Sequence, residues 1–321
     1  MLPHQTTPSI TKDDPIITHS ESSPPQPSPT TPTQRFRLEF QYDGTRYSGI
    51  QKQTTTPNTI QQLLEHCLHL MLNMKSPSPP LPPPELTVSS RTDRGVHACL
   101  NTAHVDMSLV NPHLMADEHK MKHVLNHMLG DESIRVLRIH PVGDAYDCKK
   151  NVRTRRYMYR ILDGCGGGGQ PLSTQVDQNM YPLEGMKLWM LRETLDVDRM
   201  REGLQYFVGS HSMTSFSSTS DPNRNKSKVI DPVKTIEEVS IESVYNCMLN
   251  RNEIRIFVQS KSFLKHQIRF MVQVIVKIGK LEVEPNRIEM LLKEERRDTD
   301  TKYMAPAHGL YLLNVIEKDI V

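Results

Sequence analysis

The sequence predicts an α+β protein with two ferredoxin-like units, whose antiparallel sheets lie side by side and leave a cleft between the units. Three observations predict this fold class. Short segments with an apolar residue at every second position alternate with segments of helical periodicity. The first half runs strand–helix–strand–strand–helix–strand, the order of a ferredoxin-like unit, which an RNA-recognition motif shares. The second half repeats the alternation less regularly, and 321 residues suffice for about two domains.

Composition sets the expected domain boundaries. Residues 1–33 contain eight prolines among Ser and Thr and almost nothing apolar to bury, which predicts a disordered tail. Residues 34–145 and 146–321 are the two predicted α+β halves. The tail has no apolar stretch typical of a secretory signal, and the first arginine, Arg35, follows three acidic residues, unlike a mitochondrial presequence. We therefore expect an intracellular protein, with cytoplasm and mitochondrion both left open.

Charge and cysteine content exclude several classes of protein. Lys and Arg number 39 against 37 Asp and Glu, a net charge of +2, so the chain is neither acidic nor histone-like, although a local basic groove remains compatible. No run approaches 18 apolar residues, so no membrane span is expected. The five cysteines are scattered without a CxxC pair, which favours neither a zinc ribbon nor a disulfide framework.

The first half is predicted to begin with a strand over residues 35–42. Four apolar residues at every second position predict it: Phe36, Leu38, Phe40 and Tyr42. Asn58 is the expected N-cap of a helix over 60–72, with Gln61 three residues later. The further expected elements are a Pro/Ser loop at 76–84, strands at 86–90 and 103–107, a helix at 113–129 and a strand at 134–139.

The second half is predicted to carry a glycine-rich loop at 164–169, which lacks the lysine of a phosphate-binding P-loop. The expected elements after it are a helix at 195–208, strands at 234–244 and 253–260, helices at 263–279 and 285–295, and a final strand at 309–316. His66, Cys67 and His69 lack the spacing of zinc ligands, so no metal site is predicted.

The most distinctive segment, Ser90–Ala98, has the sequence SRTDRGVHA and lies between two predicted strands. Polar residues around a glycine at the end of a strand are typical of a functional loop. Arg91, two residues before Asp93, can keep that carboxylate ionised or reach past it to a phosphate. The alternative is a turn in which Asp93 only caps local backbone amides.

A basic and aromatic segment extends from Tyr146 to Arg160. Six cationic side chains and one acidic side chain give it a net charge of +5 over 15 residues, and three tyrosines are interleaved with them. Cations that neutralise phosphates beside rings that stack on bases are what an unpaired RNA loop requires. The alternative is a solvated strand face with the tyrosines packed in the core.

A third segment, Ser262–Met271, opens a helix whose remainder is almost wholly apolar. An arginine in a mostly buried helix is costly unless it is paired, so Arg269 is expected to have a carboxylate partner. The alternative is that Arg269 lies at the edge of the helix.

These segments together resemble the TruA-type family of tRNA pseudouridine synthases. Residues 90–98 resemble its signature loop, GRTDAGVHA. Further matches occur in family order between residues 35 and 316: YDGT at 42–45, the run at 146–159, GSH with Phe216 at 209–216, the segment 262–269 and APAHGLYL at 305–312. The chain is most similar to the metazoan synthase-like 1 branch. Arg94 stands where the family usually has a small residue.

The resemblance implies an enzyme that isomerises uridine to pseudouridine in RNA, with no cofactor and no metal. The expected substrate is tRNA, with mRNA as the alternative; a homodimer is also open. Asp93 matches the essential carboxylate, which acts as a nucleophile on the sugar or base or as a base on the sugar. Arg269 matches its counter-charge, and Tyr157 matches the tyrosine that stacks on the target base.

The same resemblance implies a set of RNA contacts. Arg91 matches the residue that helps to extrude the target nucleotide, and Leu310 matches an apolar wall behind the base. The other expected RNA-binding residues are Thr92, Tyr157, Lys149, Lys150, Arg155 and Arg156.

Two other functions are weighed against this one. A non-catalytic RNA-binding protein on the same scaffold would follow if Arg94 locked Asp93 in an ion pair. An unrelated RNA-recognition module would not need Asp93 together with Arg269.

Overall fold

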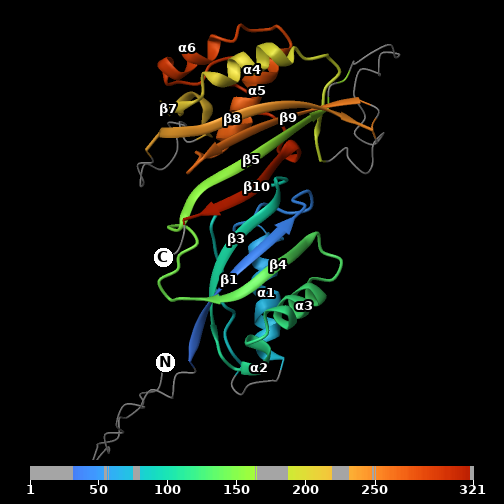
Figure 1. Ribbon diagram of the computed structural model, residues 1–321, viewed down its shortest axis with the longest axis vertical. Helices are drawn as coiled ribbons and strands as arrows, with labels where there is room; N and C mark the ends of the chain where they lie inside the picture. The colour runs from blue at the N-terminus through green and yellow to red at the C-terminus, as the bar shows by residue number, and fades with distance from the viewer. Residues whose placement is uncertain are drawn as a thin grey trace, which may run out of the picture. The chain divides into compact units, whose positions relative to one another are not determined.

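The computed structural model describes residues 32–53, 56, 58–74, 80–162, 164, 187–218, 231–247, 249 and 251–318. Most of the predicted tail, residues 1–31, lies outside the described residues. So do residues 76–79 of the predicted Pro/Ser loop and residues 165–169 of the predicted glycine-rich loop. The described part is a mixed α+β fold, which confirms the α+β part of the predicted fold class (Figure 1).

Ten strands form one continuous sheet. They are β1 (Thr33–Tyr42), β2 (Thr87–Val88), β3 (His97–Ser108), β4 (Ile134–Val142), β5 (Val152–Leu162), β6 (Trp189–Met190), β7 (Gly209–Ser212), β8 (Val233–Asn246), β9 (Arg251–Ser260) and β10 (Leu310–Glu317). The strand order is β4-β1-β3-β10-β5-β9-β8-β7, with β2 paired to β3 and β6 paired to β5. The β3–β10 and β5–β6 pairs are parallel and the other pairs are antiparallel.

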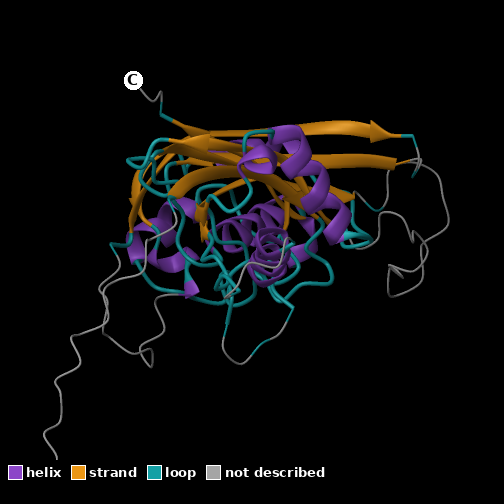
Figure 2. Cartoon of the chain, turned by 90° about the horizontal axis from the view of Figure 1, so that it is seen from below, coloured by secondary structure: helices purple, strands orange, loops and turns teal. Residues whose placement is uncertain are grey.

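Six α-helices accompany the sheet in the described part of the chain. They are α1 (Ile60–Asn73), α2 (Pro112–Met115), α3 (Glu118–Leu129), α4 (Val197–Gln205), α5 (Gln267–Gly279) and α6 (Arg287–Glu294). In Figure 2 most of the helices lie on one side of the strands. The inward residues of β9, Ile254, Ile256 and Val258, share one apolar core with the buried residues of α5. No helix in the described ranges is long and apolar enough to cross a membrane.

The first strand has the predicted alternation, since Phe36, Leu38 and Phe40 are buried between less buried neighbours. The predicted N-cap of α1 is wrong by one residue. Asn58 has φ +68° and donates its side-chain amide to the Arg46 carbonyl, so it belongs to the preceding loop. The hydroxyl of Thr59 caps the helix instead by accepting from the Gln62 amide.

The single helix predicted over 113–129 is two helices. Asp117 is extended, and its side chain accepts from the Lys120 amide, so it ends α2 and caps α3. The helix predicted from residue 263 starts four residues later, at Gln267, because residues 264–267 form a turn closed by Gln267 N–H donating to the Leu264 carbonyl.

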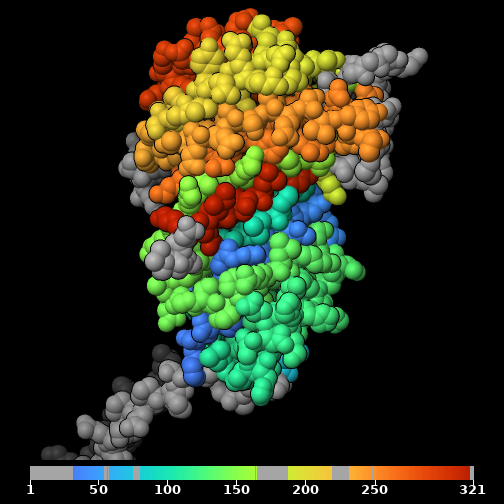
Figure 3. Space-filling view, viewed as in Figure 1, coloured from blue at the N-terminus to red at the C-terminus, as the bar shows by residue number. Residues whose placement is uncertain are grey.

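The last strand of the chain lies in the middle of the sheet. β10 pairs with β3 from the first half and with β5 from the second half. Figure 3 shows it as a red band between green and blue segments. Close packing fixes its start, because a Cβ at Gly309 would lie 2.7 Å from the ring of Tyr159, whose hydroxyl donates to the Pro306 carbonyl.

Candidate active site

Asp93 opens a tight turn in the loop between β2 and β3. The Val96 amide donates to the Asp93 carbonyl at 3.2 Å, and Gly95 at the third position has φ +78°. Such a turn favours glycine at that position because a side chain there would be strained. The Asp93 side chain remains 33% exposed, so the turn presents the carboxylate at the surface.

The residues before Asp93 anchor the loop to the first half of the sheet. The Thr92 hydroxyl and the Tyr42 hydroxyl are 2.7 Å apart in the core, and the Thr92 carbonyl accepts from the Ile50 amide. Asn101 on β3 donates to the Ser90 carbonyl at 3.0 Å. The Thr92 side chain is therefore directed inward, and its predicted RNA contact stays a prediction.

Arg155 anchors the loop to the second half. Its Nε donates to the Ser90 hydroxyl at 2.7 Å and one Nη to the Ser89 carbonyl at 2.6 Å, while the other Nη donates to the Lys261 carbonyl. Three segments that are far apart in the sequence meet at this guanidinium. These hydrogen bonds give Arg155 a structural role, and its predicted contact with RNA stays a prediction.

Tyr157 lies two residues further along β5, on the same face of the strand. The side chain is buried, and its ring packs edge to face with Phe263 at 5.3 Å between centroids. Burial, with a smaller effect of the Asp93 charge, raises the pKa of Tyr157 to about 12. The phenol is therefore protonated at neutral pH. Leu310 is also buried and lies opposite Tyr159 in the β5–β10 register.

Arg269 lies in the first turn of α5 and is half-buried. Its Nε donates to the Ala305 carbonyl at 2.7 Å, and its own carbonyl accepts from the Ala305 amide. Burial lowers the pKa of Arg269, and the nearby charge of Asp93 partly opposes this effect. The expected direct ion pair is not formed among the described residues, because the guanidinium is committed to a carbonyl and interacts with Asp93 only at longer range.

The direct neighbour of Asp93 is His266, which sequence analysis did not single out. Its Nε2 lies 3.4 Å from Asp93 Oδ1, and its Nδ1 lies 2.6 Å from the Ser218 hydroxyl. The only signal in the sequence is its place three residues before Arg269. Pairing across 173 residues of sequence leaves no local pattern to detect.

The expected RNA-binding cations do not share one surface. Lys149 and Lys150 are exposed after Tyr146, in a turn where both backbone amides donate to Asp147. Arg156 alternates with Tyr157 on β5 and so faces the other side of the sheet, where its guanidinium lies over the Phe257 ring. The basic segment is thus divided between a loop and two strand faces.

Two further arginines flank Asp93 in the loop. Arg91 and Arg94 are both exposed, and neither forms an ion pair with another residue that the structure describes. The locked pair of Arg94 with Asp93, on which the non-catalytic alternative depended, is therefore not formed.

One group of three potential metal ligands occurs in the described ranges: His104, Asp147 and Cys148. His104 Nδ1 already accepts from the Cys148 amide, and the Cys148 thiol donates to the Thr87 carbonyl. Burial raises the pKa of this thiol to about 12, which disfavours the thiolate that a metal would need. This group does not fit a metal site.

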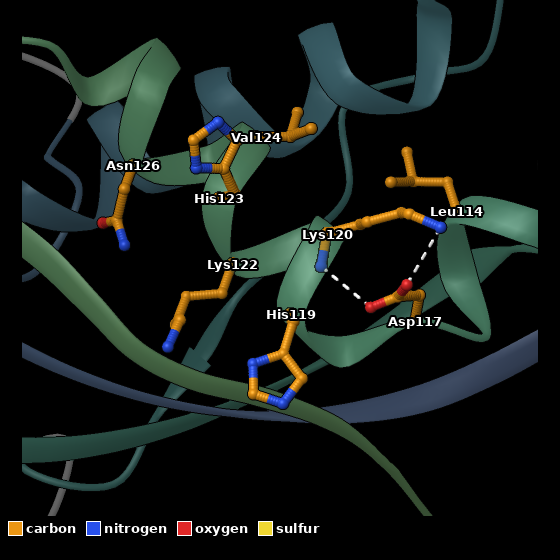
Figure 4. Close-up of a pocket in the computed structure, with 8 residues that line it drawn as sticks. All are labelled: Leu114, Asp117, His119, Lys120, Lys122, His123, Val124 and Asn126. Atoms are coloured by element: carbon orange, nitrogen blue, oxygen red, sulfur yellow. Dashed lines mark hydrogen bonds and ion pairs between the residues drawn. The ribbon is translucent and has the colours of Figure 1, made fainter.

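A shallow cavity of about 560 Å³ lies over α2 and α3 (Figure 4). Its lining includes Lys120, Lys122, His119 and His123, and Lys120 pairs with Asp117. None of the predicted site residues lines it. The chemistry therefore centres on the Asp93 loop and not on this depression.

Comparison with known proteins finds a matching family model and several similar proteins. The family model, described as tRNA pseudouridine synthase, matches residues 204–316. The resemblance inferred from the motifs is thus confirmed: the chain is similar to proteins described as tRNA pseudouridine synthases.

Individual relatives make the relationship more specific. Two proteins named tRNA pseudouridine synthase-like 1, from Xenopus laevis and Homo sapiens, are each 29% identical to it; the matches cover 88% of this chain and 90% and 89% of the relatives. tRNA pseudouridine synthase A of Ehrlichia chaffeensis is 27% identical, over 88% of this chain and 99% of its own length. A solved structure of an unknown protein from Galdieria sulphuraria matches with a TM-score of only 0.17 and 11% identity, too low to support a comparison.

Proposed function

We propose that this protein is a pseudouridine synthase that isomerises uridine in RNA, with tRNA as its substrate. The observation that carries the proposal is the convergence of three sequence-distant motifs on one carboxylate. The charge of Asp93 interacts with Tyr157 from β5 and with Arg269 from α5. The named activity of relatives that align along nearly their whole length supports the same reaction.

In the proposed reaction the N1–C1′ bond breaks, the uracil turns, and C5 bonds to C1′ while C5 loses its proton and N1 gains one. Asp93 acts as the ionised carboxylate on the sugar or the base. The guanidinium of Arg269 supplies a positive charge near that carboxylate without occupying its oxygens. Tyr157, protonated at neutral pH, offers a ring face for the base and a hydroxyl donor rather than a base for the C5 proton.

The strand order supports the finer architecture that we propose. β4-β1-β3-β2 in the first half and β10-β5-β9-β8 in the second half each have the order of a ferredoxin-like unit. The active-site cleft would lie between these two units. Extruding the target nucleotide costs a few kcal/mol. Contacts between RNA phosphates and the positive charges of exposed Arg91, Lys149 and Lys150 would offset this cost.

The activity is tested with RNA carrying tritium at C5 of uridine. Release of tritium into water, together with pseudouridine in the nuclease digest, is the expected result for the purified chain acting on total tRNA. Release from an mRNA pool but not from tRNA would correct the substrate. No release from either pool would overturn the proposed activity. Sedimentation of the same sample tests the homodimer, which stays a prediction.

A further inference from the structure

The backbone of His266 adopts a conformation that is unusual for its residue type. It has φ +63°, ψ 4°, in the left-handed region, at the N-cap of α5, and its side chain makes no capping hydrogen bond. It occupies the third position of the turn 264–267, where glycine or asparagine is usual. Residues held in this strained region concentrate at functional sites.

The ring of His266 is held between two partners. Nδ1 lies 2.6 Å from the Ser218 hydroxyl, and the Ser218 amide donates to the Lys265 carbonyl, so serine and histidine belong to one braced turn. Nε2 lies 3.4 Å from Asp93 Oδ1. The His266 side chain is 16% exposed and the Asp93 side chain 33%, so the contact lies at the edge of the surface and is partly screened by water.

The tautomer and charge of the His266 ring determine whether Nε2, the nitrogen that faces Asp93, carries a proton. If the Ser218 hydroxyl donates to Nδ1, the neutral imidazole carries its proton on Nε2. If the ring is protonated, Nδ1–H donates to the serine and Nε2 again carries a proton. In both of these states Nε2 carries a proton and lies within ion-pair distance of Asp93 Oδ1, and Oδ2 is left for the reacting atoms. The remaining tautomer, with its proton on Nδ1, would turn the Nε2 lone pair towards the carboxylate, which repels it.

We propose that His266, braced by Ser218, is a positioning residue that lies against Asp93 Oδ1 and so holds the carboxylate in one orientation. This inference rests on the proposed function. Other charged or titratable groups reach Asp93 from each packed element: Arg91 and Arg94 beside it in the loop, Tyr157 on β5 and Arg269 on α5. Unlike these groups, His266 lies within ion-pair distance of Asp93, and it is the only such residue in the described part of the chain.

The test separates the ring from the backbone conformation. His266→Gly removes the ring but suits positive φ, so the turn is retained. Leu281→Gly is the matched control, because Leu281 has φ +61° just past the other end of α5 and is 65% exposed. We expect His266→Gly to lower kcat at least tenfold, with KM and RNA affinity within about threefold, and Leu281→Gly to match the wild type.

Rescue by a conservative variant distinguishes positioning from mere packing. His266→Gln, whose amide can also face the carboxylate, should recover part of kcat. Ser218→Ala leaves the ring in place without its brace and should lower kcat less than His266→Gly does. A wild-type kcat in His266→Gly would overturn the proposal.

A readout without catalysis keeps this inference distinct from the proposed function. In protein labelled with carbon-13 at aspartate Cγ, the Asp93 resonance is assigned by its loss in Asp93→Asn. Carbon-13 relaxation of this resonance should indicate one fixed orientation in the wild type and a more mobile carboxylate in His266→Gly. Unchanged relaxation would refute the role of His266 even in an active enzyme. Changed relaxation in a protein that makes no pseudouridine would reject only the activity.

Discussion

Asp93 combines partial exposure with a surrounding of fixed donors and charges. Its turn is fastened at Thr92 to the core of the first half, while Arg269 and Tyr157 approach from the second half. A carboxylate that must react needs both features, because it has to reach the substrate and yet remain in one orientation.

The first residue-scale prediction concerns the charge of Asp93. Asp93→Asn keeps the size of the side chain but cannot carry a negative charge, so pseudouridine formation should be abolished. RNA affinity should stay within about threefold of the wild type, as measured by filter binding. Asp144→Asn, an exposed change outside the site, is the control. Measurable turnover by Asp93→Asn would remove Asp93 from its proposed role.

The second residue-scale prediction concerns Arg269. Arg269→Met loses both the positive charge near Asp93 and the Nε donor to the Ala305 carbonyl, so the rate should fall strongly. Arg269→Lys restores a cation without the planar guanidinium geometry and should be intermediate in kcat. Single-turnover rates of the three proteins decide the order. Equal rates for Arg269→Met and the wild type would show that the positive charge of Arg269 does not contribute to the reaction.

At the scale of elements, strand alternation decides what a basic segment can do. Neighbours on β5 point to opposite faces, so Arg155 and Tyr157 share the face towards the core and Arg156 faces the other side. The loop lysines are independent of this alternation. Composition alone cannot distinguish these positions.

The salt dependence of RNA binding tests whether RNA contacts the loop lysines or the strand face that carries Arg156. Lys149→Ala with Lys150→Ala should reduce the magnitude of the log–log slope by about 0.7–0.9 for each lost phosphate contact. Arg156→Ala should change the slope less, because its guanidinium lies over Phe257 on the other face. A larger effect from Arg156 than from the lysines would place the RNA on that face of the sheet.

A buried charge cluster connects three strands of the second half. Glu253 on β9 accepts from Arg160 on β5, Arg255 on β9 and Asn246 on β8. Although burial acts in the opposite direction, these donors lower the pKa of Glu253 to about 2. Because the folded-state value is depressed, its stabilisation is complete above the unfolded value near 4.5 and is lost as pH falls towards 2.

Glu253→Gln tests this contribution. It should lower the free energy of unfolding by about 3 kcal/mol at pH 7, because it removes the buried negative charge that pairs with Arg160. It should also flatten the fall of stability between pH 4.5 and pH 2. Denaturant unfolding at a series of pH values measures both effects. If the free energy of unfolding fell equally steeply with decreasing pH in the variant and the wild type, Glu253 would not contribute to the acid dependence.

At the scale of the whole molecule, β10 joins the two halves. It is the last element in the chain, yet it lies between β3 and β5 and brings the Ala305–Pro306 segment to Arg269 and Tyr159. The site is therefore complete only when the end of the chain has taken its place in the sheet.

Two positions on β10, Leu312 and Asn314, test whether the fold depends on this strand. Leu312→Asp places a carboxylate in the fully buried core and should destabilise the protein by more than about 3 kcal/mol. Asn314→Asp changes an exposed position of the same strand and should stay within about 0.5 kcal/mol. Thermal unfolding followed by circular dichroism compares them. Similar melting temperatures would show that β10 is dispensable.

The sequence by itself determined the α+β class, most strands and helices, and the choice of Asp93, Tyr157 and Arg269 as candidate site residues. Periodicity specifies which face of an element is buried, and motif spacing specifies residue types, because both are local properties of the chain. The same locality explains the errors at Thr59, Asp117 and Gln267, where a side chain or turn contact decided the end of a helix.

Only the tertiary structure decided the partners of those residues. It placed His266 against Asp93, committed Arg269 to the Ala305 carbonyl, and made Arg155 a link between three segments. It also separated Arg156 from Tyr157 and put β10 between the two halves. Each of these outcomes depends on contacts across tens to hundreds of residues, and such contacts follow from strand order and packing, which leave no pattern in the local sequence.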